Sequence, residues 1–257
     1  YSIAGLLSSK RPLIKARPFR SPHHTSSSAA LAGGGRIPGP GEVTLAHRGV
    51  LFLDEMPEFA RGSLEVLRQP LEDKQIQLSR ASGTYVFPAG FILVAAMNPC
   101  PCGYYPDMNK CRCTPGEVSH YLHKLSQPLL ERIDLCADVP PVNFSQISGE
   151  KSGESSALIR KRVEKARRIQ QKRYQNEKIC FNGKLSGKQI RKYCVLTENA
   201  FQVAKNAFEL MELSARSYHR ILKVSRTIAD MEGEELIHTR HVAEALTYKA
   251  FDKKYRS

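Results

Sequence analysis

The sequence of 257 residues lacks a glycine-rich phosphate loop of the form G-x-x-x-x-G-K-S/T. The nearest string, Gly183 to Gly187-Lys188, is one residue short and continues with Gln189. The sequence also has no run of 18 or more apolar residues, which argues against a membrane-spanning helix, and no signal peptide pattern at its start. We therefore expect a cytoplasmic protein without membrane contact, and one in which no phosphate loop is available to bind a nucleotide.

Acidic residues are scarce in the second half of the chain. The net charge is +14, and residues 151–257 carry 24 basic and 12 acidic side chains, against 15 and 13 in residues 1–150. The segment from Arg160 to Lys192 contains 13 basic residues and only two acidic ones. Such a block suggests a polyanionic partner, with a solvated helix face as the alternative. The candidate DNA contacts in it are Arg167, Arg168, Lys172 and Arg173.

Two apolar runs end in polar residues that suit a nucleotide site. Val50–Leu53 is followed by Asp54-Glu55, and Phe91–Ala96 is followed by Met97-Asn98. Short apolar runs of this kind predict buried strands of a parallel sheet, and α/β folds bind ligands at the carboxyl ends of such strands. The first run therefore predicts a Walker B strand, although a strand can also end in Asp-Glu by chance.

The remaining patterns predict an α/β core followed by helices. We expect a loop or insert over residues 1–40, a helix over 64–71, strands over 76–78 and 91–96, and a hairpin over 79–88 whose turn is Ser82-Gly83. Pro140-Pro141 predicts a domain boundary, so the core spans 1–141 and a helical domain spans 142–257. Helices are expected at about 154–177, 186–193, 197–212, 215–232 and 239–250.

Four segments together resemble the Mg-chelatase-like AAA+ ATPases. They are PFRSPHHT (18–25), GVLFLDEMPEF (49–59), AAMNPCPCG (95–103) and LLERIDL (129–135). The order and the set are similar to the competence-associated ComM/YifB branch. The resemblance implies a partial AAA+ parallel-sheet core, a helical lid related to the Mg-chelatase C-terminal domain, and ATP and Mg²⁺ as ligands. Because Tyr1 is not Met and the first Met is Met56, we expect the phosphate loop upstream of this segment.

The resemblance also implies roles for single residues. Asp54 holds magnesium through its water shell, Glu55 polarises the attacking water, and Asn98 is a sensor of the γ-phosphate, unless it only caps a turn before Pro99. Arg132 is a finger that reaches the nucleotide of a neighbouring subunit, which implies a ring, expected to be a hexamer; a local pair with Glu131 or Asp134 is the alternative.

Two further basic residues take roles from the same resemblance. Arg216 is the second sensor, with Arg220 as the alternative. Related AAA+ helicases carry a pore hairpin where residues 79–88 lie, so Arg80 is a candidate DNA phosphate contact; a hairpin that only packs on the lid is the other interpretation.

Four cysteines form a second candidate site, the loop over residues 100–113. Two close pairs, Cys100-Pro101-Cys102 and Cys111-Arg112-Cys113, are separated by a polar loop, which suits a structural zinc ion. The C-x-C spacing is tighter than the common C-x-x-C, and free thiols or a disulfide are the alternatives. We interpret His23-His24 as part of the insert and not as a metal site.

Three functions agree with these patterns. The first is an AAA+ ATPase that remodels or translocates on DNA as a homo-oligomeric ring. The second is a basic, zinc-stabilised binding module without turnover, and the third is a chelatase-type ATPase that acts through a partner protein. We expect the chain by itself to be inactive, because the phosphate loop supplies most phosphate contacts.

Overall fold

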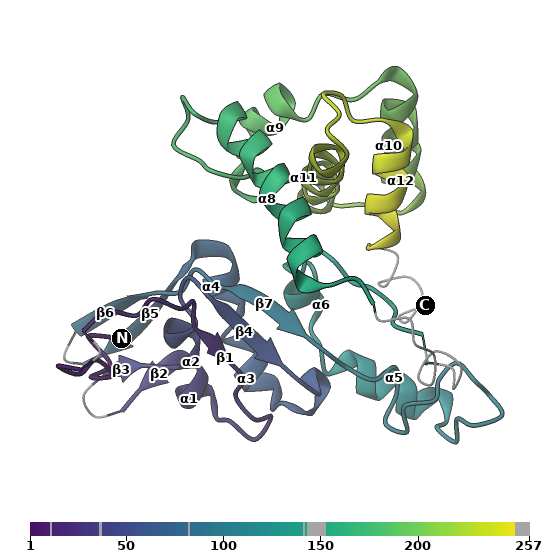
Figure 1. Cartoon of the computed structure of the whole chain (residues 1–257). Coiled ribbons are helices and arrows are strands. Elements are labelled where there is room, and N and C mark those ends of the chain that lie inside the picture. The colour runs from purple at the N-terminus through teal and green to yellow at the C-terminus, as the bar shows by residue number, and fades with distance from the viewer. Residues whose placement is uncertain (11, 36–37, 82, 141, 143–152, 250–257) are drawn as a thin grey trace. The chain divides into compact units, whose positions relative to one another are not determined.

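The computed structural model describes residues 1–10, 12–35, 38–81, 83–140, 142 and 153–249 (Figure 1). The chain divides into two compact units, Tyr1–Ile133 and a second unit that begins at Asp134. The first contains a parallel sheet with short helices, and the described part of the second is helical. The expected α/β fold class with a helical second part is therefore confirmed. No helix among the described residues is both long and apolar enough to cross a membrane.

Three parallel strands form the sheet of the first unit, in the order β1-β4-β7. They are β1 (Phe19–Arg20), β4 (Val50–Leu53) and β7 (Ile92–Ala95). Leu51 and Leu53 on one face of β4 are fully buried and anchor the core cluster, as the two-residue period of a strand requires. A glycine is needed just before β4, because a Cβ on Gly49 would lie 1.9 Å from the carbonyl oxygen of Pro18.

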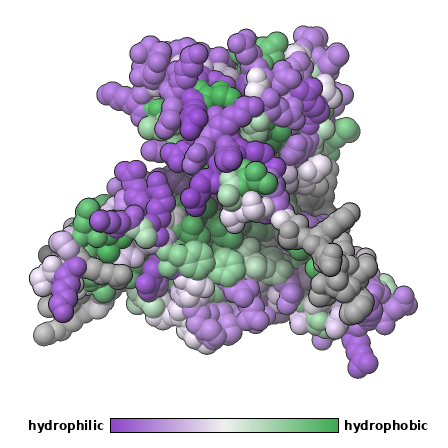
Figure 2. Space-filling model, in the orientation of Figure 1, coloured by the Kyte–Doolittle hydropathy of each residue, from purple (hydrophilic) through white to green (hydrophobic). Residues whose placement is uncertain are grey.

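The opposite face of this sheet keeps apolar side chains uncovered by the described residues. Phe19, Ile92 and Val94 are all exposed, and the Phe19 ring stacks on Phe52 with centroids 6.1 Å apart. Figure 2 shows apolar residues gathered over the strands of the first unit.

The region expected to be loop or insert, residues 1–40, contributes to the core of the first unit. It supplies β1, helix α1 (Ser28–Ala32) and the paired strands β2 (Gly33–Gly34) and β3 (Gly39–Pro40). Leu31 of α1 is fully buried in the main core cluster. The Ser27 side chain caps α1 by accepting from the backbone N–H of Ala30. The expectation of a loop is thus wrong for these segments.

A single helix over 64–71 is also replaced by two short ones. They are α3 (Arg61–Glu65) and α4 (Arg68–Asp73). Pro70 explains the break: it has no N–H to donate to the carbonyl of Val66, and its ring would clash there, whereas the first turn of a new helix tolerates proline. The other helices of the unit are α2 (Glu42–Leu45), the 3₁₀ turn η1 (Met56–Glu58), α5 (Pro115–His123) and α6 (Gln127–Leu130).

An antiparallel hairpin connects α4 to the sheet. Strands β5 (Gln75–Arg80) and β6 (Gly83–Pro88) pair along their whole length, from Gln75 opposite Pro88 to Arg80 opposite Gly83. Ile76 and Phe87 are buried where the hairpin leaves the core. The turn residue Ser82 and the side chain of Arg80 lie outside the described residues.

The described part of the second unit packs five α-helices and one 3₁₀ turn around its own core. They are α8 (Ser156–Arg173), η2 (Asn182–Lys184), α9 (Gly187–Tyr193), α10 (Glu198–Leu210), α11 (Ala215–Glu232) and α12 (Thr239–Thr247). Serine or threonine side chains cap α8, α9, α10 and α11 at their N-termini. The predicted boundary at Pro140-Pro141 includes Pro141, which lies outside the described residues.

Candidate functional site

The polar residues that follow β4 and β7 lie at one edge of the parallel sheet. The two strands pair from Val50 opposite Ile92 to Leu53 opposite Ala95. The pairing continues one step further, because the N–H of Ala96 donates to the carbonyl of Leu53 (2.9 Å). Asp54, Glu55 and Asn98 therefore leave the sheet at the same edge, where parallel sheets bind ligands.

The backbone turns sharply at the acidic pair. Glu55 is left-handed (φ 50°), its N–H donates to Asp54 Oδ1 (2.9 Å), and the N–H of Met56 donates to the carbonyl of Ala96 (3.0 Å). A left-handed conformation is unfavourable for a glutamate and is held here by these two bonds. Both carboxylates are exposed, so the turn presents them to solvent and not to the core.

A histidine from the first strand joins this edge. His24 follows β1, and its Nδ1 lies 3.3 Å from Glu55 Oε2. The His23 ring packs on the His24 ring with centroids 4.0 Å apart, and His23 Nδ1 is 2.9 Å from Thr25 Oγ1. Sequence reasoning placed His24 in an insert, because the two-residue strand β1 that carries it to β4 has no apolar run to indicate a strand.

Arg132 is held within the first unit. Its guanidinium donates from Nη2 to Glu72 Oε2 (2.5 Å) and from Nη1 to the carbonyl of Pro128 (2.6 Å), and the side chain is 13% exposed. The local partner is thus Glu72, which is distant in sequence, and not Glu131 or Asp134. A finger role in a neighbouring subunit requires Arg132 to leave Glu72, whose side chain is 41% exposed.

The two candidates for the second sensor both lie on α11 in the second unit. Arg216 is exposed in the first turn of the helix, and Arg220 is one turn further along with its Nη1 3.3 Å from Asp134 Oδ1. Arg216 is the more accessible of the two.

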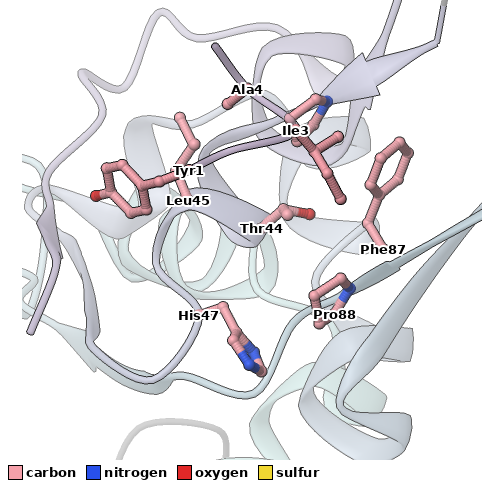
Figure 3. A pocket seen from close by; sticks show the side chains of 9 residues that line it. Tyr1, Ile3, Ala4, Thr44, Leu45, His47, Phe87 and Pro88 are labelled. Atoms are coloured by element: carbon pink, nitrogen blue, oxygen red, sulfur yellow. The ribbon is translucent and has the colours of Figure 1, made fainter. Parts of the chain in front are cut away.

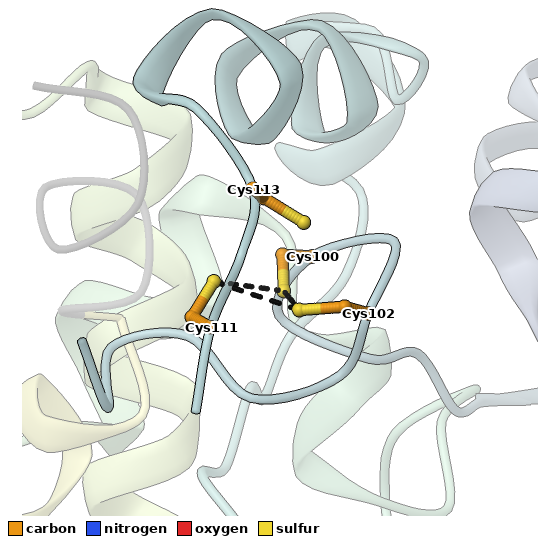
Figure 4. A group of neighbouring side chains, drawn as sticks. All are labelled: Cys100, Cys102, Cys111 and Cys113. Carbon is orange, nitrogen blue, oxygen red and sulfur yellow. Dashed lines mark hydrogen bonds between the residues drawn. The ribbon is translucent and has the colours of Figure 1, made fainter. Parts of the chain in front are cut away.

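The four cysteines converge from two segments of the first unit, as the expected site requires (Figure 4). Their sulfur atoms all lie within 4.8 Å of one another, with Cys100 to Cys102 at 3.4 Å, Cys102 to Cys111 at 3.6 Å and Cys100 to Cys111 at 3.8 Å. None of these four cysteines forms a disulfide. Backbone N–H groups of Tyr104 and Arg112 lower the pKa of Cys102 to about 6, which favours its thiolate.

Most of the basic residues of α8 point away from the core of the second unit. Arg167, Arg168 and Lys172 are exposed. Arg173 differs: its guanidinium donates from Nη1 to Asp230 Oδ2 (2.9 Å) and from Nη2 to Asp230 Oδ1, and Asp230 is fully buried. Because Arg173 is engaged inside the unit, we remove it from the candidate DNA contacts.

A small pocket of about 110 Å³ lies elsewhere in the first unit (Figure 3). Tyr1, Thr44, His47 and Phe87 are among its lining residues, and none of the lining residues belongs to the predicted site. Burial lowers the pKa of His47, helped by the charge of Arg48, and its Nδ1 accepts from the N–H of Gly90 (3.0 Å). The pocket therefore lies apart from the predicted site, beside an imidazole whose neutral form is favoured by burial.

Comparison with known proteins defines the class. Residues 1–147 match the family model described as magnesium chelatase, subunit ChlI, and residues 153–249 match the model of its C-terminal part. The chain therefore belongs to the Mg-chelatase-like AAA+ family.

Within that family, the relatives point to one branch. The chain is 49% identical to competence protein ComM of Haemophilus influenzae and 47% identical to the uncharacterized protein YifB of Escherichia coli, each over 238 residues. It is 46% identical over 240 residues to YifB of Salmonella typhimurium. Each alignment covers 92% of this chain and 46% of the relative. The chain belongs to the ComM/YifB branch and spans about half the length of these relatives.

Proposed function

We propose that the full-length gene product containing this chain hydrolyses ATP in a ring, expected to be hexameric, and remodels or translocates on DNA. The observation that carries the proposal is the convergence of Asp54, Glu55 and Asn98 at the carboxyl edge of β4 and β7. Membership in an AAA+ family supports the same reaction. The name of one relative, a competence protein, supports DNA as the partner.

The residues at this edge fit a magnesium nucleotide. Carboxylate and amide oxygens are the ligands that suit Mg²⁺, and the carboxylates of Asp54 and Glu55 are exposed and close in the chain. When bound, the ion neutralises charge on the phosphate oxygens. Asp54 would hold the ion through its water shell, Glu55 would accept the proton of the attacking water, and Asn98 would hold that water or the γ-phosphate by its amide.

Two arginines complete the proposed site. Arg132, released from Glu72, stabilises charge on the nucleotide of the neighbouring subunit, a contribution of about 10³ to 10⁵ in kcat in related phosphoryl transfer enzymes. Arg216 is the proposed second sensor of the γ-phosphate, a role that rests on membership in the family. In mixtures of Glu55→Gln and Arg132→Ala subunits we expect partial recovery of turnover, because each variant damages a different face of the shared interface. Full turnover by Arg132→Ala alone contradicts the finger role.

We further propose that the cysteine cluster binds zinc. A tetrahedral ion with Zn–S distances of about 2.3 Å places its sulfur ligands about 3.8 Å apart. The sulfur separations among Cys100, Cys102 and Cys111, 3.4 to 3.8 Å, are near this value and well beyond a covalent bond, and Cys113 lies within 4.8 Å of them. Elemental analysis of protein purified without chelator should find one zinc per chain; well under one contradicts the site.

The exposed basic residues of α8 are the proposed DNA contacts. Replacing Arg167, Arg168 and Lys172 with Gln should weaken duplex binding for all sequences. The slope of log K against log salt should become shallower by about 0.9 for each phosphate that the variant no longer neutralises. Lys205, an exposed lysine on α10 outside the block, gives the control Lys205→Gln. Equal slopes for wild type and the triple variant would favour the interpretation of the basic block as a solvated helix face. Arg80 would then be the next candidate DNA contact to test.

The overall proposal is tested by ATP turnover of the full-length product with and without DNA. We expect turnover that DNA stimulates. DNA binding without any turnover supports a binding module instead, and turnover that is indifferent to DNA supports a chelatase-type role through a partner protein.

A further inference from the structure

The cysteine cluster begins two residues after the proposed sensor Asn98. We propose that the metal-closed loop of residues 100–113, here called the cysteine loop, positions Asn98 for ATP hydrolysis. The cysteines are then positioning residues of the ATPase reaction and not only a stabilising element. This inference rests on the ATPase function proposed above and gives the bound metal a role in catalysis, the positioning of Asn98.

The sheet does not hold Asn98 by itself. The β4–β7 pairing ends with the bond from Ala96 to Leu53, and the carbonyl of Ala96 is already used by Met56. Asn98 is two residues beyond this last anchor, and its side chain is exposed. The nearest fixed point on its other side is Cys100, which is fully buried. The segment between sheet and cysteine loop is therefore short and is fixed at both ends.

The cysteine loop also turns back close to the Asn98 side chain. The N–H of Gly103 donates to the carbonyl of Cys100 (3.0 Å), so the chain turns back just after the first ligands. Gly103 is left-handed (φ 82°), and a Cβ on it would lie 3.9 Å from Asn98 Cγ. The N–H of Tyr105 then donates to the sulfur of Cys100 (3.4 Å). The turn at Gly103 therefore lies near the Asn98 side chain, with no room for more than ordinary van der Waals contact if a side chain were added there.

Helix α5 links the same cluster to the Walker B side. Tyr121 and Leu122 of α5 pack on Cys100 in one small apolar cluster, and the Tyr121 hydroxyl lies near the backbone of Asn98. Lys124, just after α5, pairs with Glu58 of η1 (3.3 Å), three residues beyond Glu55. The cysteine cluster is thus connected through α5 both to Asn98 and to the turn that carries Glu55.

The metal is the one part of this set of contacts around Asn98 that an experiment can remove. The apolar cluster around Cys100 is small, so the thiolate–metal bonds are its strongest connections, and metal binding free energy is also folding free energy. Loss of the metal should loosen residues 97–103 while leaving β4 and β7 paired through the main core. We expect weaker hydrolysis with nearly unchanged nucleotide binding, by analogy with the 10-fold to 100-fold effects of changes around metal ligands.

The experiment compares cysteine variants of the full-length gene product. Cys111→Ser removes one ligand, Cys111→His restores a ligand that zinc accepts, and Cys180→Ser replaces an exposed cysteine outside the cluster. Each is assayed for zinc content, affinity for a fluorescent ATP analogue, kcat, and hydrogen exchange of the peptide that contains Asn98. We expect zinc loss, faster exchange and a kcat lower by about 10-fold to 100-fold in Cys111→Ser alone, with affinity within about twofold of wild type.

A double-mutant cycle with Asn98→Ala assigns the effect to the sensor. If the cysteine loop acts through Asn98, Cys111→Ser should lower kcat by less than about twofold when Asn98 is already alanine. The same fold-loss in both backgrounds overturns the inference, as does unchanged exchange of the Asn98 peptide in the zinc-free variant. If Cys111→Ser lowers the melting temperature, Cys111→His distinguishes general destabilisation from loss of the metal. The proposal then requires that Cys111→His regain zinc binding, protection of the Asn98 peptide from hydrogen exchange, and kcat together. Absence of turnover in the wild type contradicts the proposed function itself, independently of the exchange data.

Discussion

The buried ion pairs of the second unit provide a sharp test of its packing. Asp230 is fully buried and accepts from Arg173, from Arg226 Nε (3.1 Å) and from Asn182 Nδ2 (2.8 Å). Arg226 is itself 1% exposed, and burial lowers the pKa of its guanidinium. Asp230→Ala leaves two guanidinium groups without their carboxylate, and removing one partner of a buried pair costs about 3–5 kcal/mol of unfolding free energy.

The control is another Arg–Asp pair of the same unit. Asp134 is 68% exposed and pairs with Arg220, so Asp134→Ala should cost less than about 1 kcal/mol. Because the sequence contains no tryptophan, urea unfolding is best followed by far-ultraviolet circular dichroism of the helices. We expect Asp230→Ala to lower the midpoint of the second unit's transition by about 2 M urea. Equal midpoints for the two variants would falsify the buried network and return Arg173 to the candidate DNA contacts.

Three further predictions concern single contacts. His24→Ala should lower kcat about tenfold with little change in KM, because His24 orients the Glu55 carboxylate; an unchanged kcat in steady-state kinetics removes that role. Glu72→Gln should free Arg132 and raise the rate of ring assembly with ATP, measured by light scattering, and slower assembly contradicts the idea that this pair competes with the interface. Hydrogen bonds from Tyr193 and Gln189, then Lys192, lower the pKa of Glu177, so its stabilisation is present above about pH 4.5 and is lost as pH falls through the folded value. Melting curves of wild type and Glu177→Gln should therefore converge on acidification, and a constant difference argues against the linkage.

The helices of the second unit were the most predictable part of the fold. Their apolar residues recur at helical spacing, and capping serines and threonines mark where they begin, as Ser214 does for α11. The expected span 215–232 for α11 agrees with the structure, whereas α8 is shorter at both ends than the expected 154–177.

The first unit was harder to predict where an element is too short to carry a period. β1 has two residues and is defined by its pairing with β4, which sequence alone does not display. For the same reason the proximity of His24 to Glu55 escaped prediction, although Asp54, Glu55 and Asn98 follow recognisable strands. The Arg173–Asp230 pair joins residues 57 positions apart, and a basic run gives no sign that one of its members has a buried partner.

The central claim is that the edge formed by β4 and β7 hydrolyses ATP with Glu55 as the group that activates water. The most direct measurement is steady-state ATP turnover of full-length Glu55→Gln beside wild type, together with the nucleotide affinity of both. The account predicts that the variant binds ATP about as tightly as wild type and turns it over at least about 100-fold more slowly. Wild-type turnover in Glu55→Gln would contradict the claim.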